Sequence, residues 1–335
     1  MTTLTQCDEE DETGAALDKP VLDTALVADG KEIFRFDTFG DEVFWTDLLH
    51  IDKAILGDAN GGFGSGVSPT TALAVGLKVD AEALPASLVT DIGAGQVDLN
   101  DPATTVALLK LDAVVGLKGS FDVSGKLISL GVTCAVCHST VDDSFAPGIG
   151  KRLDGWANRD LNVGAILSLT DNAQPVADLL KVDEATLRTV LAAWGPGKYD
   201  AVLFLDGKAQ RPDGTIKPDL IPSAYGMQGI ELTTYTGWGD ISYWNNMVAV
   251  NEMHGSGNFS DPRLNDAAKY PITTENGLYN ITVSNDLVTA KLPALREYQL
   301  SLDPPVPPVS SYDKASADLG KALFTGKANC ASCHK

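Results

Sequence analysis

The pentapeptide Cys134-Ala135-Val136-Cys137-His138 occurs a second time, with one change, as Cys330-Ala331-Ser332-Cys333-His334. Two thiols separated by two residues and followed at once by an imidazole form the attachment signature of c-type haem: the thiols bond to the porphyrin and the imidazole binds the iron. The sequence therefore predicts two covalently attached haem c groups. The predicted attachment thiols and axial iron ligands are Cys134, Cys137 and His138 in the first copy and Cys330, Cys333 and His334 in the second.

Two other kinds of site use a Cys-x-x-Cys pair, namely a zinc site and a thioredoxin-like dithiol. Neither requires a histidine directly after the second cysteine, whereas both copies here have one. Outside the two motifs the chain has only Cys7 among its five cysteines, and only His50 and His254 among its four histidines. Haem attachment is therefore the preferred interpretation, and zinc or a disulfide is the alternative.

The composition is typical of a soluble globular protein with an acidic surface. The 335 residues are 44% hydrophobic, and the mean hydropathy is zero. No apolar run approaches the roughly 18 residues that a membrane span needs. The net charge of -20 repels phosphate, so we expect no nucleic-acid partner and favour basic or neutral partners.

The first residues bear on location. Haem c is attached outside the cytoplasm, so we expect a periplasmic or secreted protein, yet residues 1–6 lack the apolar stretch of a signal peptide. We expect the export signal to lie outside the given chain. Leu4-Thr5-Gln6-Cys7, followed by acidic residues, resembles a lipoprotein cleavage box, but Gln6 is too large for the usual small residue, and a disordered acidic tail is favoured.

Composition divides the chain into four predicted segments. They are an acidic disordered tail over residues 1–29, an N-terminal haem domain over 30–303, a Pro-rich linker over 304–311 and the start of a C-terminal cytochrome c domain over 312–335. The run Pro304-Pro305-Val306-Pro307-Pro308 favours a stiff polyproline II spacer. A cytochrome domain completes its haem pocket with residues after the attachment motif, so we expect the second domain to be incomplete in this chain.

The predicted fold class is mainly α with long irregular loops around the haems. Asp101-Pro102 predicts a helix start, and Gly116 its end. Asp183 predicts a second start, for a helix with apolar residues at helical spacing that ends at Gly195. A short amphipathic helix is expected over residues 312–324.

A further helix is predicted between Asp240 and Gly255, and we expect it to form the distal wall of the first haem pocket. His254 and Met247 are the candidate distal ligands. The alternatives are a capping or surface role for His254 and core packing for Met247.

A Pro-Gly turn over residues 144–150 follows the first motif. A similar turn in cytochromes c passes the proximal face of the haem and offers a carbonyl to the second ring N–H of the histidine. Pro147 is the candidate for that carbonyl, and a plain surface turn is the alternative. Lys151, Arg152 and Arg159 are expected to be surface charges or partners of the haem propionates.

With both motifs placed, the sequence resembles the di-haem cytochrome c peroxidase superfamily, and it is most similar to the branch that contains rubber oxygenase. The wide separation of the two motifs suits that branch. The pair Tyr243-Trp244 and the later Phe259 lie at offsets similar to the Phe-Trp pair and the downstream Phe of its first haem pocket, with Tyr243 in place of Phe.

This resemblance implies cytochrome c-like domains with a reactive first haem and a six-coordinate, electron-transferring second haem. It also implies that Tyr243, Trp244 and Phe259 line the first haem pocket or relay electrons. Calcium between the domains occurs in the peroxidases, but no clear acidic loop supports it here.

Two functions follow from these expectations. The first is a haem-dependent oxidoreductase, peroxidase- or oxygenase-like, whose first haem acts on peroxide or dioxygen while the second passes electrons. The second is a non-catalytic periplasmic electron carrier with both haems six-coordinate. The expected partners are a redox partner protein or a small oxidant. The sequence shows no distal His–Arg pair of the kind that assists many peroxidases, which counts against the first.

Overall fold

The computed structural model describes residues 21–206, 218–234 and 237–332. The chain divides into two units, Met1–Leu302 and Asp303–Lys335, and each is described on its own. This division falls at the start of the predicted Pro-rich linker. Cys7, Cys333 and His334 lie outside the described residues.

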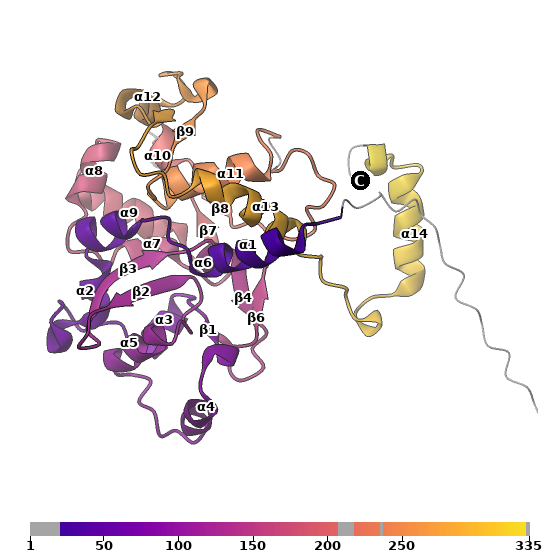
Figure 1. Ribbon diagram of the computed structural model, residues 1–335. Coiled ribbons are helices and arrows are strands. Elements are labelled where there is room, and N and C mark those ends of the chain that lie inside the picture. The colour runs from indigo at the N-terminus through magenta and orange to yellow at the C-terminus, as the bar shows by residue number, and fades with distance from the viewer. Residues whose placement is uncertain (1–20, 207–217, 235–236, 333–335) are drawn as a thin grey trace, which may run out of the picture. The chain divides into compact units, whose positions relative to one another are not determined.

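Helices joined by long loops make up most of the first unit (Figure 1), which confirms the prediction of a mainly α fold. The helices are α1 (Thr24–Phe36), α2 (Ile51–Leu56), α3 (Pro69–Ala74), α4 (Ala86–Gly93), α5 (Pro102–Lys110), α6 (Ala135–His138), α7 (Val163–Leu167), α8 (Gln174–Leu180), α9 (Glu184–Trp194), α10 (Leu203–Asp206), α11 (Ile241–Met247), α12 (Pro271–Asn276) and α13 (Leu292–Leu300). Two further segments, η1 (Val43–Leu48) and η4 (Val248–Glu252), are π-helical.

Strands in the described part of the chain pair only two at a time. The parallel pair is β1 (Val79–Asp80) with β5 (Ile149–Gly150). The antiparallel pairs are β2 (Leu117–Phe121) with β3 (Leu127–Val132), β4 (Ser139–Val141) with β6 (Arg152–Asp154), β7 (Lys198–Tyr199) with β8 (Asp219–Leu220), and β9 (Phe259–Ser260) with β10 (Asn280–Ile281). Such short strand pairs connect neighbouring loops and do not form an extended sheet.

The predicted helix starts are confirmed. Asp101, Asp183 and Asp240 each place a carboxylate on a backbone N–H of the first turn, which satisfies a donor that has no partner within the helix. The whole of α9 was predicted, including its end before Gly195.

The predicted end of α5 was wrong. The helix stops at Lys110 and not near Gly116, because Asp112 has a left-handed backbone (φ 53°) and the next residues become extended. There the Asp80 N–H donates to the Ala113 carbonyl, and the Val115 N–H donates to the Lys78 carbonyl. Pairing with a distant segment therefore outweighs the helical spacing of the apolar residues.

Helix α1 begins inside the predicted acidic tail, so the boundary at residue 29 was wrong. The Asp23 carboxylate accepts from the N–H groups of Ala25 and Leu26 and starts the helix at Thr24. α1 lies beside α13 (Figure 1), and the two pack closely because Gly30 has no side chain. A Cβ atom at Gly30 would lie 2.0 Å from the Ala294 carbonyl oxygen.

A buried ionic cluster joins β4 and β6 to these two helices. The Asp154 carboxylate accepts from Arg35 Nε at 2.6 Å and from Arg152 Nε and Ser139 Oγ, each at 2.7 Å; the Tyr298 hydroxyl also donates to it. Arg152 is buried, so the expectation that it is a surface charge was wrong. Its guanidinium donates to Asp154 inside the protein, within the cluster that β6 forms with α1 and α13.

The second unit contains α14 (Lys314–Thr325), for which the Asp313 carboxylate caps Ser316 N. This helix lies within two residues of the predicted one. A short 3-10 turn, Cys330–Ser332, holds the start of the second motif. Within the parts of the chain that the structure describes, no helix has the length and apolar character needed to cross a membrane.

Candidate functional site

The first Cys-x-x-Cys-His motif forms a single helical turn, α6, between the end of β3 and the start of β4. Gly116 sits directly against this turn with a left-handed backbone (φ 82°), and a Cβ there would lie 2.2 Å from the Val136 Cα. The Thr133 N–H also donates to the Gly116 carbonyl at 2.9 Å. Gly116, predicted only as a helix stop, thus allows β2 to support the motif at backbone distance.

The two thiols of this motif are free and half-buried. Burial, with Asp37 and Asp41 nearby, raises the pKa of the Cys134 thiol to about 12. Burial and then Glu252 raise the pKa of Cys137 to about 12 as well. Both sulfur atoms are therefore protonated at neutral pH, are not joined to each other, and are open to covalent attachment.

His138 is positioned by a carbonyl from a distant loop. Its Nδ1 lies 3.0 Å from the Pro222 carbonyl oxygen. Because a carbonyl only accepts, Nδ1 carries the proton, and burial lowers the pKa of the imidazole. The neutral ring therefore keeps the lone pair of Nε2 free, which is the form in which histidine binds a metal.

Pro147 was the wrong choice for this carbonyl. The turn over residues 144–150 is folded on itself, because Asp142 accepts from Ser144 and Lys151 N–H groups and Asp143 accepts from Gly148 N–H. No local pattern marks Pro222 as its replacement, since it lies far along the chain from His138.

A second segment, residues 155–158, is hydrogen-bonded to the backbone of the motif. The Gly155 N–H donates to the His138 carbonyl, and the Asn158 N–H donates to the Cys137 carbonyl, both at 2.8 Å. The buried Asn158 amide also donates to the Gly76 carbonyl at 2.9 Å and to that of Val136 at 3.3 Å. The sequence interpretation missed Asn158, which links the motif turn to two other segments.

The predicted distal helix exists but changes form. After α11 the chain widens into the π-helical turn η4, and it then reaches His254 with a left-handed backbone (φ 63°). Two hydrogen bonds hold this end: Gly255 N–H to the Ala249 carbonyl at 2.8 Å, and Trp45 Nε1 to the Met253 carbonyl at 3.2 Å. π-turns and left-handed residues other than glycine are enriched at functional sites.

The His254 imidazole lies in an aromatic slot. It stacks on Phe44 with ring centroids 3.8 Å apart and meets Phe204 edge-on at 4.6 Å. Its Nε2 is buried and has no hydrogen-bond partner among the described residues. Burial lowers the pKa of His254 to about 4. His254 is thus a neutral imidazole packed between two aromatic rings, and its Nε2 makes no hydrogen bond to a described residue.

We call α11, η4 and the residues that lead to His254 the His254 wall. Other polar atoms on it also have no partner among the described residues. They are Trp244 Nε1, Glu252 Oε1 and both side-chain polar atoms of Asn251. Glu252 lies close enough to the motif to raise the pKa of Cys137, and burial followed by Asp200 raises its own pKa to about 8. The η4 end of the wall therefore adjoins the attachment turn.

These atoms provide a test of whether a haem fits the residues present. A buried polar group without a partner is costly and rare in native proteins, so a concentration of them marks a place where something other than the described chain supplies the contact. Free thiols and a neutral His138 are the donors that haem c attachment needs, so the residues of the motif turn fit the group.

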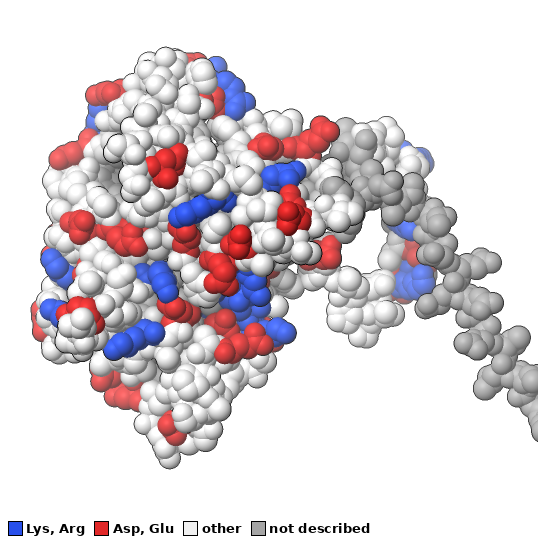
Figure 2. Space-filling view, viewed as in Figure 1, with Lys and Arg blue, Asp and Glu red and all other residues white. Residues whose placement is uncertain are grey.

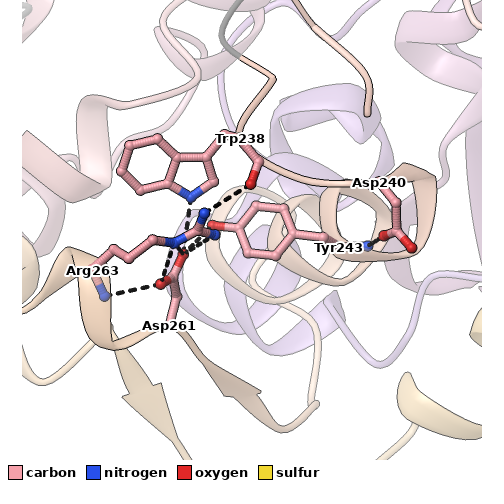
Figure 3. A network of polar contacts seen from close by, with 5 residues as sticks. All are labelled: Trp238, Asp240, Tyr243, Asp261 and Arg263. Atoms are coloured by element: carbon pink, nitrogen blue, oxygen red, sulfur yellow. Dashed lines mark hydrogen bonds and ion pairs between the residues drawn. The ribbon is translucent and has the colours of Figure 1, made fainter. Parts of the chain in front are cut away.

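Tyr243, Trp244 and Phe259 gather with one another. The ring centroids of Tyr243 lie 5.3 Å from Trp244 and 6.0 Å from Phe259. The Tyr243 hydroxyl and Trp238 Nε1 both donate to Asp261 Oδ2, at 2.7 and 2.9 Å (Figure 3). Tyr243 therefore ties α11 to the segment after β9 through Asp261, which also accepts from Trp238 in the loop before α11.

The carboxylate of Asp261 is the centre of this network. Arg263 donates to it and stacks over Trp238 at 4.4 Å. Burial works to raise the pKa of Asp261, but hydrogen bonds from Arg263, Tyr243 and Trp238 lower it overall. Each polar group drawn in Figure 3 has a protein partner, in contrast to the wall around His254.

The remaining candidate ligand, Met247, is buried in the hydrophobic core. Within the described ranges, no three His, Cys, Asp or Glu side chains group so as to hold a metal ion on their own. A haem iron needs one or two protein ligands, because the porphyrin supplies the others.

Comparison of the chain with protein-family models, with curated proteins and with solved structures finds no match in any of the three.

Proposed function

We propose that the protein is a c-type cytochrome of the di-haem peroxidase type, which transfers electrons through a haem c attached at Cys134 and Cys137 and a second at Cys330 and Cys333. The observation that carries the proposal is the neutral His138, with Nδ1 on the Pro222 carbonyl, in the same turn as two free thiols. A bound haem supplies a one-electron iron couple and, where one axial position is open, a binding place for peroxide or dioxygen.

Each residue of the first site has a definite task. The Cys134 and Cys137 thiols would each add across one vinyl C=C bond of the porphyrin, with the sulfur bonding to one carbon and the thiol hydrogen passing to the other. Pro222 fixes the proton on His138 Nδ1, orients the ring and makes Nε2 a stronger electron donor. Because haem c is attached outside the cytoplasm, the proposal includes a periplasmic or secreted location.

We propose His254 as the sixth ligand of this haem. Its imidazole is neutral above about pH 4, its Nε2 is unused among the described residues, and Phe44 and Phe204 hold the ring in place. Fixing the ring beforehand reduces the entropy lost on ligation. With both axial positions filled by imidazoles, the first haem is suited to electron transfer.

The second candidate function is a peroxidase- or oxygenase-like reaction at the first haem. The observation that favours it is the pair of polar side chains beside His254, Asn251 and Glu252, whose buried atoms lack partners among the described residues. A purely electron-transferring site has no need of such groups. When His254 is displaced, they are placed to hydrogen-bond a small oxidant and to orient it.

Haem content tests the attachment. The full chain, produced with a haem-attachment system, is expected to show two haem c per chain in a pyridine haemochrome spectrum. Cys134→Ser with Cys137→Ser should remove one, and the matched pair Cys330→Ser with Cys333→Ser should remove the other. A chain without covalent haem, or one that holds zinc by elemental analysis, overturns the proposal.

Spin state separates the two functions. His254→Ala is expected to convert one haem from low spin to high spin and to allow rapid binding of cyanide or carbon monoxide. His50→Ala is the matched control, because His50 is the other histidine outside the motifs and pairs with Asp171 at 2.7 Å. A native protein that already has one high-spin, ligand-binding haem favours the enzyme.

A further inference from the structure

An aromatic pair lies on the surface beside the two segments that hold His138. Trp156 and Tyr225 meet edge-on with ring centroids 5.9 Å apart. Trp156 is 37% exposed, unlike the buried tryptophans Trp45 and Trp194. Large aromatic side chains are enriched at protein interfaces, where they supply much contact area at low entropic cost.

Each ring belongs to one of those segments. Trp156 follows Gly155, whose N–H donates to the His138 carbonyl at 2.8 Å. Tyr225 follows Ala224 in the loop whose Pro222 carbonyl accepts from His138 Nδ1 at 3.0 Å. The Ala224 N–H donates to the Gly155 carbonyl at 2.7 Å and joins the segments to each other. Both rings thus belong to segments that hydrogen-bond directly to His138.

We propose that Trp156 and Tyr225 form the binding site for a basic, one-electron carrier protein and that the electron enters this chain there. This inference rests on the proposed function, because it requires a haem at His138. A haem held at His138 would accept one electron from the reduced centre of the partner; the partner would be oxidised by one electron, and no atom or proton would move.

Charge selects the kind of partner. The net charge of -20 attracts a basic protein and repels an acidic one, which raises the rate of productive encounter at low salt. Acidic and basic side chains are interspersed over the face drawn in Figure 2, so no single acidic patch accounts for the charge on that face. The aromatic pair then provides the short-range contact that the long-range attraction cannot specify.

The test measures binding as well as electron transfer. The full haem-loaded chain is titrated with an oxidised, basic, single-haem cytochrome c by calorimetry at low ionic strength, and its reduction by the ferrous form is followed by stopped flow. Trp156→Ala is expected to weaken binding about tenfold or more, as for a central interface aromatic. Trp156→Phe keeps an aromatic face and is expected to lose less.

Phe145→Ala is the matched control, because Phe145 is similarly exposed (36%) on the same unit. We expect it to change binding less than twofold. Equal binding by wild type and Trp156→Ala overturns the proposal, as does a loss that Phe145→Ala reproduces. These outcomes are distinct from a failure of the proposed function, in which the haemochrome spectrum shows no covalent haem before any partner is added.

Discussion

The cluster around Asp154 and the wall that carries His254 are both buried and polar, but they differ in how far the protein satisfies them. Asp154 accepts from four side chains, and only Arg152 Nη2 in that cluster lacks a partner. The wall around His254 leaves at least four polar atoms unused among the described residues. The comparison indicates that the first region holds the fold together, and the unused atoms of the second support the ligand proposed there.

Electrostatics separates the two regions in the same way. Burial works to raise the pKa of Asp154, but Arg152, Tyr298 and Arg35 lower it overall, so the carboxylate stays charged. Glu252 has no such donors, and its pKa rises to about 8. A buried acid is charged where the protein supplies cations and neutral where it does not.

The largest expected effect is at Asp154. Asp154→Ala leaves the buried Arg152 and the partly buried Arg35 without their carboxylate, which should lower the free energy of unfolding by about 3–5 kcal/mol. Urea unfolding measures the loss. Glu275→Ala is the control, since its ion pair with Lys181 is exposed and should contribute less than about 1 kcal/mol. Similar losses from both variants would contradict a structural role for the cluster.

Asp41 should give the next largest effect, and it should depend on pH. The carboxylate is fully buried and accepts from Val132 N–H at 3.2 Å; burial and then Glu42 raise its pKa to about 9. The folded protein therefore holds a proton that the unfolded chain releases near pH 4, so this group's stabilisation is complete below about pH 4 and is lost as the pH rises toward 9.

Asp41→Asn mimics the protonated form and should remove this dependence. Relative to wild type, the free energy of unfolding of the variant is expected to rise by about 4 kcal/mol between pH 5 and pH 8. Urea unfolding at pH 5, 7 and 8 compares the two proteins. Parallel profiles would mean that Asp41 is charged in the folded state.

Asn251→Leu should have a smaller effect, opposite in sign to that of Asp154→Ala. Neither side-chain polar atom of Asn251 has a partner among the described residues, so an apolar side chain of similar size should be neutral or stabilising by up to about 1 kcal/mol. If Asn251 orients a small oxidant, cyanide binding to the first haem should change as well. A loss of more than about 2 kcal/mol would place Asn251 with Asp154 as a structural residue.

Arg263→Gln should have the smallest effect. Its guanidinium is half exposed, so the ion pair with Asp261 should contribute less than about 1 kcal/mol. Asp261→Ala leaves the donors of Trp238 and Tyr243 without an acceptor and should lower the free energy of unfolding by about 1–3 kcal/mol. Thermal unfolding of the two variants tests this order; a larger loss from Arg263→Gln would show that burial does not govern these contributions.

Much of the local structure was predictable. An aspartate before an apolar periodic run marks a helix start, and Asp101, Asp183 and Asp240 all act in this way. Prediction failed where a distant segment decides the outcome. α5 ends early because its continuation pairs with residues 78–80. The chain after α11 becomes π-helical in η4, although its residues would also suit an ordinary helix.

The sequence by itself predicted haem attachment at Cys134, Cys137 and His138, which stays a prediction, and it determined the helix that starts after Asp240, because both depend on residues close together in the chain. Only the tertiary structure decided that Pro222 holds His138 and that Phe44 and Phe204 hold His254. Those contacts join segments far apart in sequence, and packing sets them together with the need to satisfy buried polar groups.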